Sequence, residues 1–580
     1  MRFVADFETN TQPDNCRVWA VGICDIADPE LYVVYNDIKY LFKHFELYPN
    51  SIYYFHNLKF DGEFIIHYLL NNGFKYRGDK KYLSTKTFTT LISDKGQHYS
   101  YTIQINDKNK ITINDSLKIL PFKVSQISEA FGIEDKKLKI DYDIPRDVGH
   151  VLTPEERAYV INDVKIVAYG LQTIFDNGLN KITQGSNALY DFKNMFGKKE
   201  FKKTFPVLDY FIDKDIRQAY RGGFTYLNPK YKGLINTSGI VLDVNSLYPY
   251  VMYSRALPYG EPIFFEGKYS KDDLYNVYIQ HINVCFELKK DYIPTIQLKN
   301  NLAFVPTEYL VSSNGEMVEL YLTNIDLQLL KSHYDIIDIE YINGWKFKSH
   351  IGFFTEYIDK WISIKNESTI TGNKALRTLA KLMLNALYGK FGLNPNVCSK
   401  IPYLKDNIVK YSNGTNEIRD SIYVPLAIFV TSYARFITIC SAQQVYERFI
   451  YADTDSLHLI GTELPKDLDV DKVKLGAWKI EEEFIRGKYL RQKCYCEEIL
   501  ITEKEYNNLI NGDYDYKNLL NKYNDKYTQF KITVAGMSDK CYTFFDFDKF
   551  EIGQRYQGKL QYQHIDGGIW LKPIDFTLKA

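Results

Sequence analysis

Acidic residues near the N-terminus have the types and spacing of metal ligands. Asp6 and Glu8 alternate along the segment RFVADFET, and residues i and i+2 of a strand point to the same side. Asp61 follows in YFHNLKFDGEF, while Tyr159 and Asp163 lie four positions apart, on one face of an expected helix. These carboxylates could bind two Mg2+ ions roughly 4 Å apart for in-line attack of water on a phosphodiester, with Tyr159 orienting the water. A solitary D-x-E is usually a solvated strand edge, so the hypothesis depends on all three elements.

A second acidic set lies further along the chain. Asp243 ends the apolar segment GIVLD, and Asp453 and Asp455 occupy YADTDS between two expected strands. If the fold brings them together, they form another two-metal carboxylate site. Lys365 and Lys381 lie in an expected helical region, where compact cations suit the oxygens of a triphosphate. In isolation, D-T-D is more often a turn and a basic stripe is more often a solvated helix face, so their combination carries the hypothesis.

A hairpin and a helix must position the first set. Residues 1–24 are predicted to form a β-hairpin around the turn segment TQPDN. A helix is predicted over 153–176, because Thr153 and Glu156 can form a capping box and an Asn-Gly pair follows its end. Strands followed by this helix indicate a mixed α/β domain up to about residue 185.

The second set depends on a helical region, 353–391, and on strands around it. Within this region, five residues recur at steps of 3, 4, 4 and 3, which places them on one helix face. The segment 255–352 is rich in strand and turn signals, and 392–426 is predicted to be a hairpin whose turn is SNGTNE. Residues 437–460 pass from a helix into the strands that flank YADTDS. The five residues of the helix face are Lys374, Arg377, Lys381, Asn385 and Tyr388.

Composition bounds the class of protein. With 580 residues, and about 150 residues per domain, the chain should hold about four domains, and its 45% hydrophobic content excludes global disorder. The 72 basic and 72 acidic side chains cancel, which excludes a simple basic nucleic-acid coat but not local basic patches. Aromatic residues reach 16%, enough for extra core packing or for platforms on which bases stack.

Cysteine usage and the N-terminal sequence indicate the cellular compartment in which the protein works. The eight cysteines lack regular metal-ligand spacing, and Cys494 and Cys496 form a solitary C-x-C, so we expect buried free thiols in a reducing compartment. The sequence MRFVADFETN lacks the apolar run of a signal peptide. No stretch is expected to approach the roughly 18 apolar residues of a membrane span. The sequence therefore predicts a soluble, cytoplasmic protein.

Several motifs resemble those of one enzyme family. SLYP with its preceding aspartate, KLMLNALYGK and YADTDS resemble motifs A, B and C of the family B DNA polymerases. The segments around Asp6, Asp61 and Asp163 resemble the three motifs of their 3′–5′ proofreading exonuclease. Further segments are similar to the protein-primed polymerases of the bacteriophage phi-29 type, over nearly the whole chain. These segments are YFHNLKFDG, NDSLKILPF, AYRGGFT, LPYGEPI and KYLRQKCY.

This resemblance implies a fold and its domains. The fold class is mixed α/β (α+β): an RNase H-like exonuclease domain followed by a right-hand polymerase of palm, fingers and thumb, with two inserted terminal protein regions. The implied ranges are 1–185 for the exonuclease, 186–254 and 427–530 for the palm, 255–352 and 392–426 for the first and second terminal protein regions, 353–391 for the fingers and 531–580 for the thumb.

The resemblance also implies roles at the polymerase site. Asp243 and Asp455, with the backbone of Val244, would ligate two metal ions, and Asp453 would support them. Tyr248 would exclude a ribose 2′-OH by steric overlap. The other implied roles are triphosphate binding for Lys365 and Lys381; contact with the nascent base pair for Asn385, Tyr388 and Gly389; template contact for Thr431 and Arg435; primer contact for Lys493 and Tyr495; and DNA contact between the two activities for Tyr220, Gly222 and Gly223.

At the exonuclease site, the resemblance implies the acidic residues that the spacing also selects. A lysine for the scissile phosphate is expected in DKKLKIDYD, which is shorter than the family pattern; Lys139 is the first choice and Lys137 the alternative. A second departure is Ala386 in motif B, where a serine is usual, so any hydroxyl contact there is missing. The implied catalytic residues are Asp6, Glu8, Asp61, Tyr159 and Asp163, of which Asp6, Glu8 and Asp163 would ligate the metal ions.

Residues near this site resemble those that hold a single-stranded 3′ end. Aromatic faces suit this role, because they stack on bases of any kind. Phe60 and Phe64 could instead be core packing at i,i+4, and His56 could be a hydrogen-bonded structural histidine. The implied 3′-end residues are Thr9, Tyr54, His56, Asn57, Phe60, Phe64, Ser116 and Leu117.

The implied function is that of a replicative DNA-dependent DNA polymerase with a 3′–5′ exonuclease. Initiation would use the hydroxyl of a terminal protein on linear phage DNA, and synthesis would be processive and strand-displacing. Region 255–352 would dock the priming protein, and region 392–426 would help to enclose DNA. Expected cofactors are two Mg2+ ions per active site, with Mn2+ able to substitute. Expected partners are primer–template DNA, dNTPs, the terminal protein as a heterodimer and a phage single-strand-binding protein, with no membrane, in the cytoplasm of the infected bacterial host.

Two alternative functions compete with this one. A DNA exonuclease whose C-terminal region only binds DNA would require the second acidic set to be inert, and the nearby Lys381 and Tyr248 argue against that. A single-strand-binding replication scaffold would explain the aromatic residues and basic faces, but not two separate acidic sets.

Overall fold

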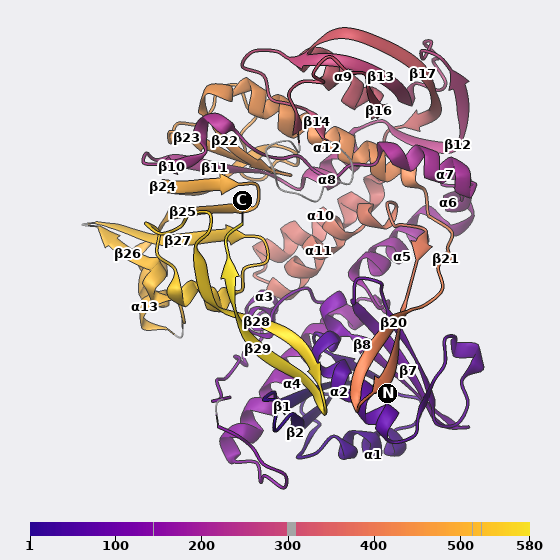
Figure 1. Ribbon diagram of the computed structural model, residues 1–580, viewed down its shortest axis with the longest axis vertical. Coiled ribbons are helices and arrows are strands. Elements are labelled where there is room, and N and C mark those ends of the chain that lie inside the picture. Colours follow the sequence, from indigo (N-terminus) through magenta and orange to yellow (C-terminus); the bar gives the residue numbers. More distant parts are fainter. Residues whose placement is uncertain (143, 298–308, 513, 524, 580) are drawn as a thin grey trace.

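The computed structural model describes residues 1–142, 144–297, 309–512, 514–523 and 525–579. In Figure 1, the N-terminal unit forms the lower part of the molecule. Helices α10 and α11 cross the middle of the molecule, and further sheets lie above them and to the side. Helices and strands are interspersed, with both parallel and antiparallel pairing. The predicted mixed α/β fold class is therefore confirmed.

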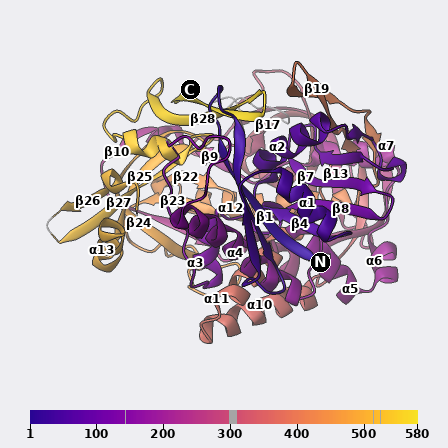
Figure 2. The same cartoon turned by 90° about the horizontal axis from the view of Figure 1, so that it is seen from below.

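The N-terminal unit is built on an eight-stranded sheet with the order β3-β2-β1-β4-β8-β7-β6-β5. The predicted hairpin is confirmed, because β1 and β2 pair antiparallel with Glu8 opposite Ala20. Figure 2 shows α1, α2 and α4 around this sheet. The strands are β1 (Arg2–Asn10), β2 (Arg17–Asp25), β3 (Tyr32–Tyr35), β4 (Ile52–Phe55), β5 (Lys75–Tyr76), β6 (Thr87–Ile92), β7 (His98–Asn106) and β8 (Asn109–Asp115), and the helices are α1 (Lys39–Leu47), α2 (Leu58–Asn71), α3 (Val124–Phe131) and α4 (Pro154–Asp176).

Helix α4 packs closely on this sheet. Its predicted capping box is present: Thr153 Oγ1 accepts a hydrogen bond from the Glu156 N–H at 3.2 Å, and Glu156 Oε2 accepts one from the Thr153 N–H at 3.0 Å. At Gly22 of β2, an added Cβ would lie 2.7 Å from Val160 of α4. Glycine at this position therefore lets the helix approach the strands that carry the first acidic set.

A nine-stranded sheet forms the second large layer, with the order β26-β27-β25-β24-β11-β23-β22-β9 and with β10 paired to β24. β22 and β23 are the strands predicted on either side of D-T-D. Cys494 and Cys496 are buried on β25, and all eight cysteines, each among the described residues, are free. The strands are β9 (Thr225–Leu227), β10 (Gly233–Ile235), β11 (Gly239–Val244), β22 (Phe449–Asp453), β23 (Ser456–Ile460), β24 (Trp478–Arg491), β25 (Cys494–Ile501), β26 (Leu520–Tyr523) and β27 (Lys526–Val534).

Helix α12 (Val424–Gln444) is long and apolar enough to cross a membrane by length and composition alone. The prediction that no segment has this character is therefore wrong. However, 78% of its most apolar window is buried inside the protein, where it packs against α8 (Leu247–Ser254) and α9 (Asn324–His333). Burial among these helices accounts for its apolar composition.

The segment 255–352 contains the predicted strands, and residues 298–308 of it lie outside the described residues. Its main sheet has the order β12-β17-β13-β16. The predicted helical region divides into α10 (Thr355–Ile370) and α11 (Lys374–Ala386), in which Leu379 and Met383 are buried. The other strands are β12 (Leu257–Glu266), β13 (Val277–Leu288), β14 (Ile296–Gln297), β15 (Tyr309–Leu310), β16 (Val318–Thr323) and β17 (Tyr334–His350), and the other helices are α5 (Gln184–Phe196), α6 (Lys198–Thr204), α7 (Tyr210–Ile216) and α13 (Glu503–Asn511).

Two long hairpins reach down to the N-terminal unit (Figure 1). They are β19 (Lys400–Lys405) with β20 (Ile408–Asn413), and β28 (Arg555–Ile565) with β29 (Gly568–Thr577). The predicted turn SNGTNE is wrong: the chain reverses at Asp406 and Asn407, whose φ angles are 52° and 59°. Two left-handed residues suit a tight hairpin turn, and Asp and Asn tolerate that conformation. SNGTNE instead leads from β20 into β21 (Glu417–Ile418), which pairs with β18 (Asn396–Val397).

Three of the expected domain boundaries divide single elements. The boundary at 185/186 falls inside α5, the boundary at 426/427 falls inside α12, and the boundary at 530/531 falls inside β27. β27 pairs along its length with β25, so it belongs to the nine-stranded sheet. The C-terminal hairpin itself begins only at Arg555.

Candidate active sites

The first acidic set converges in a cleft of about 600 Å³ between β1, α2 and α4. One carboxylate oxygen from each of Asp6, Glu8 and Asp163 lies within 4.8 Å of the others. Asp61, from the first turn of α2, lines the same cleft and is only 3% exposed. Strand and helix thus bring together side chains that are up to 157 positions apart, as the spacing predicts.

The electrostatics of this cluster fit a cation. Burial, and then the neighbouring Asp163, raise the pKa of Asp6 to about 7, and burial raises the pKa values of Glu8 and Asp61 well above the usual range. Asp61 Oδ1 and Asp163 Oδ1 are buried without a hydrogen-bond partner among the described residues. Buried, unpartnered carboxylate oxygens are suitable ligands for a hard divalent cation, so the residues present fit the expected metal.

The lysine of the cluster is Lys137, and the choice of Lys139 is corrected. Lys137 Nζ donates to Asp163 Oδ2 at 2.5 Å and lines the cleft. Lys139 Nζ lies instead 2.9 Å from Asp515, far along the chain. The described part of segment 132–142 contains no helix or strand, so periodicity could not separate the two lysines.

The sequence analysis missed Tyr142. Its hydroxyl donates to Glu8 Oε2 at 3.1 Å and lies 2.9 Å from the hydroxyl of Tyr159. Burial, and then the charge of Glu8, raise the pKa of Tyr159, so both phenols stay protonated and can donate hydrogen bonds in the cleft. The sequence signal that could have identified Tyr142 was its position in KIDYD, close after the two lysines.

The expected 3′-end residues divide into two groups. Thr9, His56, Asn57 and Phe60 line the cleft. The other four described side chains do not: Tyr54 packs in the core against Phe175, with ring centroids 5.4 Å apart, Phe64 is a core residue, and neither Ser116 nor Leu117 reaches the cleft.

His56 is a structural histidine by its contacts, as the alternative interpretation held. Its Nδ1 lies 3.0 Å from Ser116 Oγ and its Nε2 lies 2.7 Å from the carbonyl oxygen of Phe122. Burial lowers its pKa to about 4, so the ring is neutral near pH 7.

One wall of the cleft comes from the other end of the chain. Leu560, Trp570, Leu571 and Pro573 of the β28–β29 hairpin line it together with Phe60. Local sequence patterns gave no signal for this contact, because it depends on where a distant hairpin lies.

The second acidic set lines a separate cleft of about 520 Å³. Asp243 is the penultimate residue of β11 and Asp455 lies in the turn between β22 and β23. The pairing of Asp243 with Ser456 brings the two carboxylates together. The ring of Tyr248 stacks on that of Tyr388, with centroids 4.0 Å apart. The remaining expected residues in this cleft are Val244, Lys365, Lys381 and Asn385.

Lysine side chains as well as carboxylates line this cleft. Burial, and then the charge of Asp455, raise the pKa of Asp243 to about 6, although Lys479 Nζ lies only 3.5 Å from its Oδ1. Burial, and then neighbouring cations, lower the pKa values of Lys365 and Lys381. The sequence analysis missed Lys479, whose position on β24 is revealed only by the pairing of β24 with β11.

Asp453 does not line this cleft and is paired with a lysine. Lys493 Nζ donates to both of its oxygens at 2.5 Å, so this lysine of the K-x-Y element is engaged within the protein. Thr454 in the turn has φ 64°, and an added Cβ at Gly223 would lie 2.7 Å from Thr454 Oγ1. The absence of a side chain at Gly223 therefore leaves room for Thr454 in the D-T-D turn. At Gly222, by contrast, an added Cβ would meet open space.

The expected template contacts Thr431 and Arg435 are both buried on α12. Arg435, only 4% exposed, donates to Asp326 of α9 at 2.7 Å and to the carbonyl of Gly222 at 2.8 Å. Thr431 Oγ1 donates to a carbonyl of its own helix at 3.0 Å. The guanidinium is therefore occupied by protein groups, and the expectation that it faces DNA is corrected. Tyr495 is likewise buried. The hydroxyl of Tyr220 lies against Gly392, where an added Cβ would be 2.3 Å from it.

Comparisons with known proteins agree with this geometry. The model of the family "DNA polymerase type B, organellar and viral" matches residues 47–151 and 145–472. The chain is 46% identical to the DNA polymerase of Bacillus phage phi29 over 585 residues, covering 100% of this chain and 99% of that one. It is 32% identical to the DNA polymerase of Streptococcus phage Cp-1 over 602 residues, covering 100% and 98%. A solved structure of phi29 DNA polymerase with primer-template DNA and incoming nucleotide substrates superposes with a TM-score of 0.90 at 44% identity, covering 100% of both chains.

Proposed function

Because this chain belongs to the type B DNA polymerases of organelles and viruses, we propose that its two clefts perform two reactions, nucleotide addition and 3′–5′ nucleotide removal. The chain is a replicative DNA polymerase, and its partners include DNA and deoxynucleotides. Enzymes of this family use divalent metal ions, and the phage relatives act in the infected host cell. Neither a nuclease with an inert C-terminal region nor a binding scaffold is compatible with this membership.

The observation that carries the proposal is the separation of the carboxylates into two clefts with different surroundings. Asp6, Glu8 and Asp163 converge at β1 and α4, whereas Asp243 and Asp455 converge in the nine-stranded sheet. Two Mg2+ ions bound at each cluster would supply positive charge for phosphoryl transfer, with Mn2+ as a substitute. The same carboxylate chemistry would thus serve two different phosphoryl transfers, one that adds a nucleotide and one that removes a nucleotide by hydrolysis.

In the cleft of the nine-stranded sheet, the chain itself holds the incoming nucleotide. Lys365 and Lys381, partly desolvated, attract the triphosphate. Tyr248, fixed by its stacking on Tyr388, forms a floor that leaves no room for a ribose 2′-OH. Asn385, from the last turn of α11, faces the same space.

In the N-terminal cleft, the chain positions water and the terminal phosphate. Tyr159 and Tyr142 form a pair of phenolic donors beside Glu8, and they orient the attacking water. Lys137 provides the positive charge for the scissile phosphate. Phe60 offers an aromatic face to the last bases of a single strand.

Initiation and strand separation complete the proposal. Region 255–352 docks a terminal protein whose hydroxyl primes synthesis, and the β19–β20 hairpin helps to enclose DNA, so that synthesis is processive and displaces the downstream strand. The enzyme works on linear phage DNA in the host cytoplasm with a phage single-strand-binding protein. The similarity to the phage enzymes over the whole chain supports these roles.

Paired assays on one preparation test the proposal. A 5′-labelled primer–template should be extended with Mg2+ and dNTPs, and a 5′-labelled single strand should be shortened from its 3′ end without dNTPs. A chelator should stop both reactions. Extension without shortening would contradict the assignment of the N-terminal cleft.

A further inference from the structure

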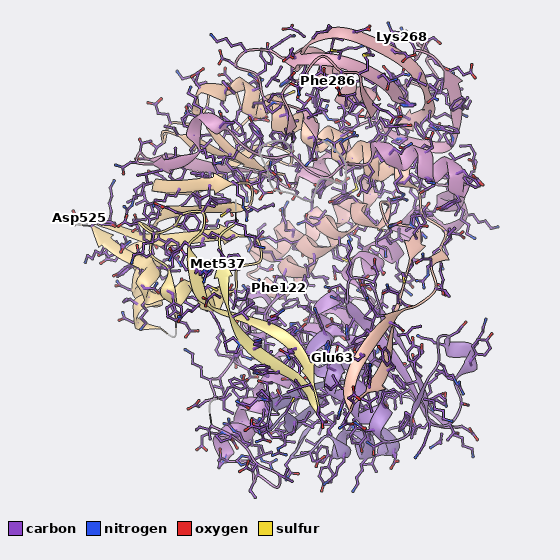
Figure 3. The ribbon with its side chains drawn as sticks, in the orientation of Figure 1. Glu63, Phe122, Lys268, Phe286, Asp525 and Met537 are labelled. Atoms are coloured by element: carbon purple, nitrogen blue, oxygen red, sulfur yellow. The ribbon has the colours of Figure 1, made fainter. Side chains whose placement is uncertain are left out.

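The two long hairpins meet on helix α2, around the side chain of Glu63, which Figure 3 labels between them. Tyr411 of β20 donates to Glu63 Oε1 at 2.8 Å. His564 Nε2 of β28 lies 3.2 Å from the same oxygen, and His98 Nε2 of β7 lies 3.7 Å from it. We name these four side chains, Glu63, His98, Tyr411 and His564, the Glu63 junction.

The carboxylate of the junction is sealed from water by the hairpins. Glu63 and His98 are each 3% exposed, and the junction borders a cavity of about 330 Å³ that Lys59 and Lys400 also line. A carboxylate removed from water depends on hydrogen bonds and positive charge from the protein. Tyr411 supplies a hydrogen bond from one hairpin, and His564 of the other hairpin places a ring nitrogen 3.2 Å from the same oxygen. Lifting either hairpin would remove a partner from Glu63, and water could replace it only if the hairpin moved fully away.

The tips of the hairpins make a second contact one helical turn further along α2. Asn407 at the tip of β19–β20 donates to Asp566 at the tip of β28–β29 at 2.5 Å. His67 Nε2 lies 3.1 Å from the carbonyl of Asn407 and 3.1 Å from the amide nitrogen of Gly567. Glu63 and His67 are i and i+4, so one face of α2 receives both hairpins.

The seat for the C-terminal hairpin is closely fitted. An added Cβ at Gly567 would lie 2.2 Å from the carbonyl oxygen of Cys16, and one at Gly568 would lie 2.4 Å from the ring of Phe64. Only the bare backbone at these two positions lets the tip enter between the β1–β2 loop and α2. The contact is therefore specific to this arrangement of the hairpin.

We propose that Glu63 is a positioning residue for processive synthesis, which latches both hairpins to the N-terminal unit and keeps the enclosure closed around DNA. A polar latch suits this task, because its hydrogen bonds can exchange with water when DNA is loaded and re-form when the hairpins return. The inference rests on the proposed enclosure of DNA by the hairpins. It assigns the closure to one carboxylate and its partners from three parts of the chain.

Hydrogen exchange tests the latch without reference to catalysis. Glu63→Gln keeps the shape of the side chain but removes its charge, and Tyr411→Phe removes one donor without changing α2. Each should speed amide exchange about tenfold at the tips, 405–408 and 565–568, because the hydrogen bond from Tyr411 loses its charged acceptor in Glu63→Gln and its donor in Tyr411→Phe. Glu46→Gln, an exposed carboxylate change on α1, is the matched control and should change nothing. Unchanged exchange at both tips in Glu63→Gln and in Tyr411→Phe would overturn the inference.

Synthesis under a trap tests the consequence. On a primed circle with excess competitor DNA, Glu63→Gln and Tyr411→Phe should each shorten the product made per binding event about tenfold, while filling of a short gap stays at the wild-type rate. The double variant should be no worse than Glu63→Gln alone, because both changes break one interaction. Additive losses, or wild-type product lengths despite loosened tips, would overturn the assignment to Glu63. Failure of the wild type itself to extend primers would instead contradict the proposed polymerase function, so the two failures are distinguishable.

Discussion

The two acidic clefts use similar ligands in different surroundings. In the N-terminal cleft, Asp61 and Asp163 are almost fully buried, and Lys137 is the lysine that touches the carboxylates. In the cleft of the nine-stranded sheet, Asp243 is partly exposed and shares the space with Lys365, Lys381 and Lys479. Carboxylates predominate in the first cleft, and the second combines acidic and basic groups.

This difference corresponds to what each cleft must hold. Under the proposed assignment, the hydrolytic cleft receives the end of a strand with one phosphate per nucleotide, so one lysine against the carboxylates, Lys137, suffices, although Lys540 also lines the cleft. A synthetic cleft receives a triphosphate with several negative charges beside the acidic metal ligands, and several lysines must offset them. The number of cations near the carboxylates therefore distinguishes the two reactions better than the carboxylates do.

The strongest way to break the comparison is to remove a carboxylate from one cleft only. Asp455→Ala should lower primer extension by at least about 10³-fold, because charge stabilisation of the transferred phosphate is lost. Shortening of single-stranded 3′ ends should stay within about twofold of wild type. Steady-state rates of both reactions check this, and substantial synthesis by the variant would contradict the role of Asp455.

The reciprocal change is Asp6→Ala combined with Glu8→Ala. It should lower 3′-end shortening by a similar factor, about 10³-fold, while primer extension is retained. Folding is checked by circular dichroism. Loss of extension in a correctly folded double variant would show that the clefts are not independent.

A smaller effect separates the two lysines. Lys137→Ala should lower 3′-end shortening about 10- to 100-fold, because its charge lies against Asp163 in the cleft. Lys139→Ala is the matched control, since Lys139 pairs with Asp515, and it should stay within about twofold of wild type. The opposite ranking would restore Lys139 as the residue at the phosphate.

The synthetic cleft can also be altered without touching its charges. Tyr248→Val removes the ring that stacks on Tyr388, and it should reduce discrimination against ribonucleotides about tenfold or more while some synthesis persists. Competing dNTP and rNTP incorporation measures the ratio. An unchanged ratio would mean that another side chain excludes the 2′-OH.

The smallest expected effect is a pH dependence of stability in the presence of a chelator. The pKa of Asp6, about 7 in the folded protein against an ordinary 3.8, means that the folded state binds a proton the unfolded state has lost. This contribution is complete below about pH 4 and disappears as pH rises through 7. Asp6→Asn should therefore gain stability relative to wild type at pH 8, by about 1 kcal/mol or more, but not at pH 4. Thermal unfolding at both pH values checks the sign.

The sequence predicted well those parts of the sites that depend on local periodicity. Asp6 and Glu8 on a strand, and Tyr159 and Asp163 on a capped helix, required only alternation and the 3.6-residue repeat. The same elements indicated a mixed α/β domain up to about residue 185, whereas the fold of the whole chain was implied by the family resemblance. The hairpin turn at Asp406 was missed, because S-N-G-T-N-E carries a stronger turn signal than D-N, although the strand register selects the latter.

Other residues were missed because their roles depend on distant packing. Lys479 reaches Asp243 only through strand pairing, and Tyr142 lies in a segment without periodic structure. Arg435 was expected to contact the template, but it forms a buried ion pair with Asp326, more than a hundred positions away. Pairing and burial between distant segments leave no regular spacing in the chain.

The wall that the β28–β29 hairpin gives to the N-terminal cleft also orders events during translation. Asp61 leaves the ribosome 571 − 61 = 510 residues before Leu571, which is roughly 25–100 s at bacterial rates of about 5–20 residues per second. During that interval, the nascent N-terminal unit can fold and gather its carboxylates, but one side of the cleft is still missing. The first site to be encoded is thus the last to be finished, and a prematurely terminated chain would carry its acidic residues in an open trough that cannot grip a strand end.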